Sequence, residues 1–282
     1  MTRPPTDGEQ WTREALERLR EDRFTPQAIS RLLVASHRRA REARVARPAL
    51  ARQSRAWTGI GAGAWCALAA MGAQPYRRRL GGGLAWWSAV ALMLEWHLGM
   101  VETEDGDPRR LGPADALTLL RAWLIPAVAD DLDARLVAIA AATDALDGMA
   151  ARATRPTRAG RDLEGLVDAA LHLAALRSAA RTRRLSRVAI AIETIRLAAG
   201  VGYAAGAYFA HARPPDPSLT RAARRTAPLR AGGFAAAGAG RRRCGSALLT
   251  TGSLCGLVTL WLSARDQAGL PGATASPRED AR

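Results

Sequence analysis

Residues 144–168 place four acidic side chains at helical spacing on either side of an arginine-rich turn, and this stretch constrains the fold more than any other. Asp144 and Asp147 are three positions apart, and Glu164 and Asp168 are four apart. Positions three or four apart lie on one face of an α-helix. The stretch therefore predicts two helices that meet at the turn and direct their carboxylates toward each other.

Four carboxylates in one place repel one another strongly unless cations lie between them. Mg²⁺ prefers oxygen ligands of this kind and commonly shares them with phosphate. Two such ions side by side stabilise in-line displacement at phosphorus. Gly148, Ala151 and Gly160 leave room for a phosphate or a base beside the backbone. Positive charge suited to a diphosphate comes from the arginines of the turn, which are Arg152, Arg155, Arg158 and Arg161.

The pattern D-x-x-D-G-x-x-A-R, followed after seven residues by G-x-x-x-E-x-x-x-D, resembles the signature of the CDP-alcohol phosphatidyltransferases. The segment LTLLRAWLIP, residues 117–126, is similar to the first core helix of that family, which commonly carries an L-T-x-x-R element before a proline. The resemblance implies an all-α, polytopic membrane helix bundle. It also implies an enzyme of phospholipid biosynthesis that moves a phosphatidyl group from a CDP-alcohol, with CDP-diacylglycerol as the expected donor, to an acceptor hydroxyl and releases CMP. A homodimer is a further expectation of the resemblance.

The resemblance assigns roles to individual residues. Two Mg²⁺ or Mn²⁺ ions are expected on four acids, Asp144, Asp147, Glu164 and Asp168. Asp168 is also expected to be the catalytic base that takes the proton of the acceptor hydroxyl. The residues expected around the cytidine and its phosphates are Gly148, Ala151, Arg152, Gly160, Thr118 and Arg121. Family members normally have aspartate at all four acidic positions, whereas this chain has a glutamate at the third.

Apolar runs separated by arginine-rich turns organise the rest of the chain. Several of these runs approach the length needed to cross a bilayer. We expect an extra transmembrane hairpin at residues 57–101 and a six-helix family core at residues 113–264. Residues 1–56 are predicted to form an arginine-rich cytoplasmic extension, and residues 265–282 a disordered tail. Within the core, residues 211–230 are predicted to be a loop rich in proline and arginine.

Two of these segments leave alternatives open. The amphipathic pattern in the N-terminal extension is interpreted as a solvated surface, with a helix that leans on anionic lipid as the alternative. In the apolar run 185–210, Glu193 and Arg196 are three apart. The two either pair with each other, or Arg196 faces a cavity and holds a phosphate of the acceptor.

The chain has a formal net charge of +15, and every one of its 41 basic residues is arginine. Such a charge permits a nucleic-acid partner, but the arginines flank apolar runs, which is typical of membrane proteins. We therefore expect membrane lipids rather than nucleic acid as partners. The basic turn 152–162 predicts a multi-pass protein of the cell membrane with the site facing the cytoplasm. Three other arginine-rich turns, at 77–79, 177–187 and 241–243, then fall on the opposite side, against the usual tendency.

Two further interpretations compete with an active transferase. In one, the chain is a catalytically impaired homologue of the family that acts as a membrane partner or regulator, because a longer Glu164 side chain displaces a carboxylate from an ion that tolerates little distortion. In the other, the carboxylates only pair with nearby arginines at the membrane boundary.

Overall fold

The computed structural model describes residues 5–103, 105–153, 157–210 and 217–267. Within these ranges the chain is built from helices and short connections, with no strand. The helices are α1 (Asp7–Glu21), α2 (Pro26–Ala46), α3 (Pro48–Ala70), α4 (Leu80–Trp96), η1 (Leu98–Met100), α5 (Pro113–Asp130), α6 (Ala134–Ala153), α7 (Arg158–Arg181), α8 (Arg187–Ala205), η2 (Gly206–Ala210), α9 (Pro217–Gly238) and α10 (Arg242–Gln267).

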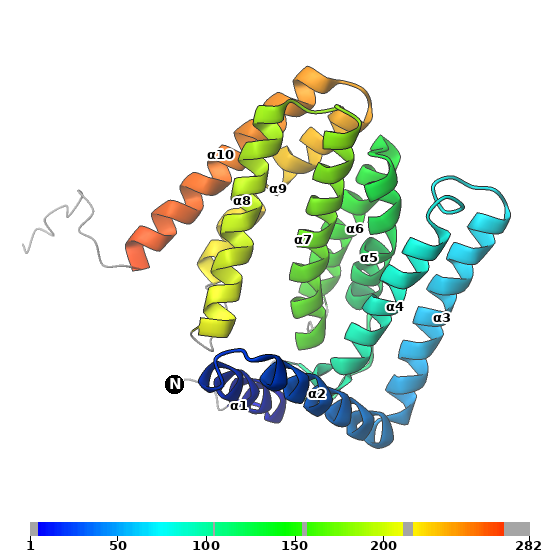
Figure 1. Cartoon of the computed structure of the whole chain (residues 1–282), viewed down its shortest axis with the longest axis vertical. Helices are drawn as coiled ribbons and strands as arrows, with labels where there is room; N and C mark the ends of the chain where they lie inside the picture. Colours follow the sequence, from blue (N-terminus) through cyan, green and yellow to red (C-terminus); the bar gives the residue numbers. More distant parts are fainter. Residues whose placement is uncertain (1–4, 104, 154–156, 211–216, 268–282) are drawn as a thin grey trace, which may run out of the picture.

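Helices α1 and α2 lie across one end of the bundle formed by the later helices (Figure 1). A capping box starts α1, in which the Thr6 hydroxyl accepts the Glu9 N–H and the Glu9 carboxylate accepts the Thr6 N–H. Pro26 opens α2 and Pro48 opens α3, at first-turn positions that tolerate the missing N–H. Arg47, at the corner between α2 and α3, donates to the carbonyls of Val101 (2.7 Å) and Leu98 (3.3 Å). This corner therefore fixes the loop that follows η1.

Helices α3 and α4 form a hairpin held by two tryptophans that pack into glycine gaps. The Trp87 ring covers Gly61 and the Trp65 ring covers Gly83, so closely that a Cβ on either glycine would lie 2.3–2.4 Å from the ring. Trp65 is 1% exposed and Trp87 is 5% exposed. The hairpin therefore depends on these pairs of a large and a small residue, which let the two backbones approach.

Helices α5 to α10 form the remaining bundle. α5 packs against α6 and α7, α6 also packs against α9, and α10 packs along α9 and α8. Where α9 and α10 cross, a Cβ on Gly233 would lie 2.8 Å from the Leu249 backbone nitrogen, and a Cβ on Gly245 equally close to the Gly233 carbonyl oxygen. The starts of α5 and α7 and the end of α6 lie at the end of the bundle where α1 and α2 cross (Figure 1).

The all-α prediction is confirmed for the described residues, with differences at several boundaries. α3 begins at Pro48 rather than at residue 57, because the helix includes the polar turns before the apolar run. The prediction of a loop at 211–230 is wrong from Pro217 onward, since proline is compatible with the first turn of a helix and α9 contains Pro228 in its interior. α10 continues to Gln267, three residues past the predicted core. The rest of the predicted tail, 268–282, lies outside the described residues.

Two of the described helical segments are long and apolar enough to cross a membrane, Arg187–Ala210 and Arg242–Leu262. Both carry large apolar side chains that face outward, including Val188 (64% exposed) on α8 and Trp261 (60% exposed) on α10. α4, by contrast, has only 17 residues, and α3 begins with a stretch that contains Arg52 and Arg55. The sequence and structure thus agree on a helical chain with two membrane-span candidates, which is less than the predicted polytopic bundle.

Candidate functional site

Three helices bring the residues of the predicted motif together. α6 carries Asp144 and Asp147, α7 carries Glu164 and Asp168, and α5 packs against both helices. One carboxylate oxygen from each of Asp144, Glu164 and Asp168 lies within 4.8 Å of the other two. Three of the four acids therefore converge from two helices that both pack against α5, as the spacing in the sequence predicts.

Arg121 of α5 lies at the centre of this acidic cluster. Its Nη1 is 3.1 Å from Asp144 Oδ1 and also pairs with Asp168, and its Nη2 donates to Asp147 Oδ2 at 2.9 Å. The Arg121 side chain is only 1% exposed. A single guanidinium thus connects three of the four predicted metal ligands, and its predicted contact to nucleotide or phosphate stays a prediction.

Asp147 differs from the other acids because it is turned toward α5. Its Oδ2 accepts hydrogen bonds from the Thr118 hydroxyl and from Arg121, both at 2.9 Å. Its side chain is 7% exposed, whereas those of Asp144 and Asp168 are 48% and 39% exposed. Thr118, predicted to touch the nucleotide, is placed by this hydrogen bond next to the acids. The cluster therefore has one buried carboxylate, at Asp147, and three that are partly exposed.

The donor set fits hard divalent cations such as Mg²⁺ or Mn²⁺. Such ions take carboxylate oxygens, and three of them already face one another at Asp144, Glu164 and Asp168. Among the described side chains, three carboxylates share the one guanidinium of Arg121, a formal charge of −3 + 1 = −2. This excess of negative charge in a partly buried site favours added cations.

The first turn of α7 is joined to the start of α5 by a buried polar network. The Thr157 hydroxyl donates to Asp115 Oδ1 (2.8 Å) and accepts the Gly160 N–H (3.0 Å), and Asp115 Oδ2 accepts the Gly112 N–H (2.7 Å). Burial raises the pKa of the Asp115 carboxyl above its ordinary value and the charge of Asp147 adds to this, while the two hydrogen bonds and the charge of Arg109 oppose it. Sequence reasoning missed Asp115, although an acid three residues after a glycine and two after a proline is a recognisable helix start.

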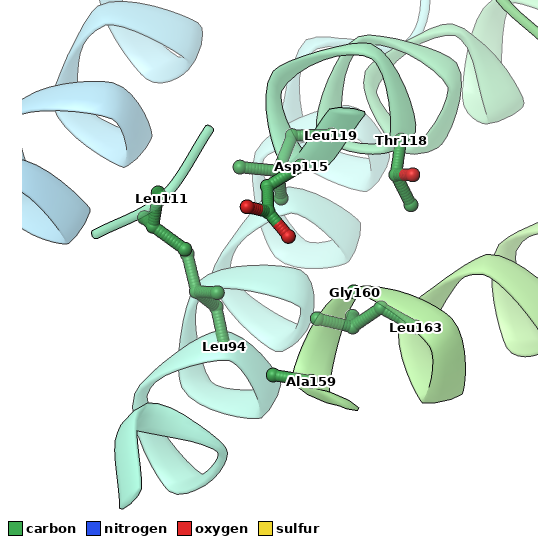
Figure 2. Close-up of a pocket in the computed structure, with 8 residues that line it drawn as sticks. All are labelled: Leu94, Leu111, Asp115, Thr118, Leu119, Ala159, Gly160 and Leu163. Atoms are coloured by element: carbon green, nitrogen blue, oxygen red, sulfur yellow. The ribbon is translucent and has the colours of Figure 1, made fainter. Parts of the chain in front are cut away.

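Gly160 is required where α7 approaches α5. A Cβ at this position would lie 2.5 Å from Asp115 Oδ1 and 2.8 Å from Thr157 Oγ1. Figure 2 shows the Asp115 carboxylate pointing toward Gly160 across a small cavity whose walls include Thr118 and Leu163. The cavity has room for about one water molecule. Gly160 therefore has a packing role in addition to its predicted contact with the nucleotide.

The other predicted nucleotide residues lie at the end of α6. Gly148 follows Asp147 and is half-buried. The side chains of Ala151 and Arg152 lie outside the described part of the structure, as does all of Arg155. Their predicted contacts to the cytidine and its phosphates stay predictions.

A second buried cluster of charges lies between α8, α9 and α10. Arg196 donates to both carboxylate oxygens of Glu193 at 2.7 Å, and the Ser253 hydroxyl is 2.7 Å from Glu193 Oε2. Arg230 Nε lies 3.9 Å from Glu193 Oε1. Of the two alternatives for Arg196, the structure shows the pairing with Glu193. Sequence reasoning missed Arg230 and Ser253, whose spacing gives no signal because they come from two other helices.

Comparisons with known protein families, with curated proteins and with solved structures find no match to this chain. A functional conclusion therefore rests on the geometry of the two clusters and on the resemblance of the motif.

Proposed function

We propose that this protein is a multi-pass membrane transferase of the CDP-alcohol phosphatidyltransferase type. The observation that carries the proposal is the convergence of Asp144, Glu164 and Asp168, whose oxygens lie within 4.8 Å of one another although they come from two helices. Acids in this arrangement are suited to bind a diphosphate through divalent ions. The outward apolar faces of α8 and α10 support a place in the membrane.

The residues of the chain suit the steps of such a transfer. Divalent ions bound at the acids would neutralise the diphosphate of a CDP-linked lipid, for which CDP-diacylglycerol is the expected donor. Asp168, at the accessible side of the cluster, would take the proton of the acceptor hydroxyl. The acceptor oxygen forms a bond to the β-phosphorus, the bond between this phosphorus and the CMP oxygen breaks, and CMP leaves.

The arginines at the opposite end of the bundle bear on the proposed orientation with the site in the cytoplasm. Arg79 Nε is 2.8 Å from Asp130 Oδ1, Arg184 pairs with Asp131 at 3.2 Å, and Arg181 donates to the Asp130 carbonyl. Four arginines of the turns at 77–79 and 177–187 therefore neutralise acids or cap helix ends. Their positive charge is partly compensated, which weakens the conflict with the positive-inside tendency.

The test is release of CMP by the purified protein in lipid nanodiscs with Mg²⁺ or Mn²⁺, CDP-diacylglycerol and a panel of alcohols. Asp168→Asn should lower the rate by roughly 10²–10⁴-fold because it removes the base. Asp22→Asn is the matched control, since Asp22 forms only an exposed ion pair with Arg31. Unchanged release by Asp168→Asn would refute the base assignment, and no release by the wild type with any alcohol would refute the transferase.

A second candidate is a catalytically impaired homologue that acts as a membrane partner or regulator. It is favoured by Glu164 in place of aspartate and by the pairing of Arg121 with three of the acids. Glu164→Asp distinguishes the two. Release of CMP that appears only in this variant supports the impaired homologue, whereas equal release by wild type and variant supports the transferase.

A further inference from the structure

The start of α1 meets the start of α7, although the two are far apart in the sequence. The Arg158 side chain, 9% exposed, donates from Nη1 to Thr6 Oγ1 at 3.0 Å and forms an ion pair with Glu9. Its Nε lies 3.8 Å from Glu102 Oε1, and its backbone N–H donates to the Glu102 carbonyl at 3.1 Å. The first residue of α7 is therefore held by α1 and by the loop after η1.

The residues that hold Arg158 are the same ones that cap α1. The Thr6 hydroxyl accepts the Glu9 N–H (3.3 Å) and donates to Glu102 Oε1 (2.8 Å), and Glu9 Oε2 accepts the Thr6 N–H (2.9 Å). Because these atoms belong to one partly buried network, a change at Glu9 affects both the helix cap and the support of Arg158.

The other end of α1 contacts the end of the long α8–η2 segment. Arg20 Nη1 donates to the Ala210 carbonyl at 2.9 Å, and the rings of Phe24, just past α1, and Phe209 are 6.2 Å apart, edge to face. Helix α1 thus extends from the start of α7 to the end of η2, across the end of the bundle nearest the acids (Figure 1).

A shift of the first turn of α7 also moves the acids farther along this helix, because a helix moves nearly as a rigid body. Glu164 is six residues beyond Arg158, about 9 Å along the helix. A small tilt at Arg158 displaces Glu164 relative to Asp144 on α6, and productive site geometry tolerates only about 0.5 Å.

We propose that Arg158 is a positioning residue, held by Thr6 and Glu9 of α1, that sets Gly160 and Glu164 against the acids of α6. The inference rests on the proposed transferase function, and it gives the N-terminal extension a role in that reaction. α1 then supports the start of α7 beside the proposed site.

The test compares Glu9→Gln with Glu14→Gln, which removes an exposed pair with Arg18 on the same helix. Spin labels at Leu146 and Leu166, both half exposed, report the distance between α6 and α7 after the exposed cysteines Cys66, Cys244 and Cys255 are replaced. Glu9→Gln should shift or broaden this distance, weaken Mn²⁺ binding by about tenfold and raise the KM for CDP-diacylglycerol more than it changes kcat. Glu14→Gln should match the wild type in all three.

A conservative substitution separates positioning from simple loss of stability. Arg158→Lys keeps a positive charge beside Glu9 and Glu102, so it should retain more of the α6–α7 distance and of the Mn²⁺ affinity than Arg158→Gln. An unaltered distance in Glu9→Gln overturns the inference even if CMP is released. An altered distance in a protein that binds no Mn²⁺ supports the role of α1 in positioning α7 and refutes the proposed function instead.

Discussion

The two buried charge clusters of this protein differ in the sign of their excess charge. At the α5–α7 site Arg121 pairs with three acids, whereas between α8, α9 and α10 two arginines share Glu193. The second cluster satisfies Glu193 completely within the chain, whereas Asp144, Glu164 and Asp168 of the first are partly exposed. The contrast indicates that the second cluster stabilises the helix packing, and it supports the proposal that the first takes up cations from outside.

The largest expected effect is on the self-contained cluster. Glu193→Ala leaves Arg196 and Arg230 buried without their carboxylate, so it should lower the free energy of unfolding by about 3–5 kcal/mol. The melting temperature in detergent, with and without Mg²⁺, measures this loss, and added Mg²⁺ should not restore it. Ser253→Ala, which removes one hydrogen bond to Glu193, is the control and should cost about 1 kcal/mol. A loss of stability in Glu193→Ala no larger than in that control would contradict the contrast.

A smaller loss of stability is expected at the acidic cluster, together with a change in ion binding. Arg121→Gln should lower the melting temperature without ions, because three acids lose their shared counter-charge. It should also tighten Mn²⁺ binding on the order of tenfold, since a competing positive charge is gone. Titration with Mn²⁺ by electron paramagnetic resonance measures this. Weaker Mn²⁺ binding would mean that Arg121 organises the ligands rather than competing with the ions.

Gly160→Ala tests the close approach of α7 to α5. The added methyl meets Asp115 and Thr157, both held by hydrogen bonds, so the variant should lose about 1–3 kcal/mol of stability. Gly165→Ala, five residues along the same helix, meets nothing within 4 Å and should gain up to about 1 kcal/mol through helix propensity. If both variants gain stability in thermal unfolding, the packing role of Gly160 is wrong.

The smallest effect is expected at the surface. Arg78 lies 3.7 Å from Asp130 and is 66% exposed, so Arg78→Gln should change the free energy of unfolding by less than about 0.5 kcal/mol. A larger loss in the same thermal assay would show that the arginines at this end support the fold as strongly as the buried ones.

Local spacing in the sequence predicted a large part of the fold and of the site. Asp144, Glu164 and Asp168 converge because three- and four-residue spacing fixes the face of a helix, and the helical class follows from the same periodicity. The contacts of Arg121 with the acids were not predicted, because they depend on how α5 packs against α6 and α7. Two of the described helical segments are long and apolar enough for a span, and the further predicted spans stay a prediction, since α3 and α4 are shorter or begin with more charge. Residue types alone gave no indication that Arg158 would bind α1.

The contact between Thr6 and Arg158 joins positions that are 152 residues apart. During translation, α1 leaves the ribosome before Arg158 has been made, and more than half of the chain is synthesised between the two. Closing so long a loop is entropically costly and slow. Docking of α1 onto Arg158 therefore cannot come before the start of α7 has been made, so the N-terminal helix takes its final place only in the second half of synthesis.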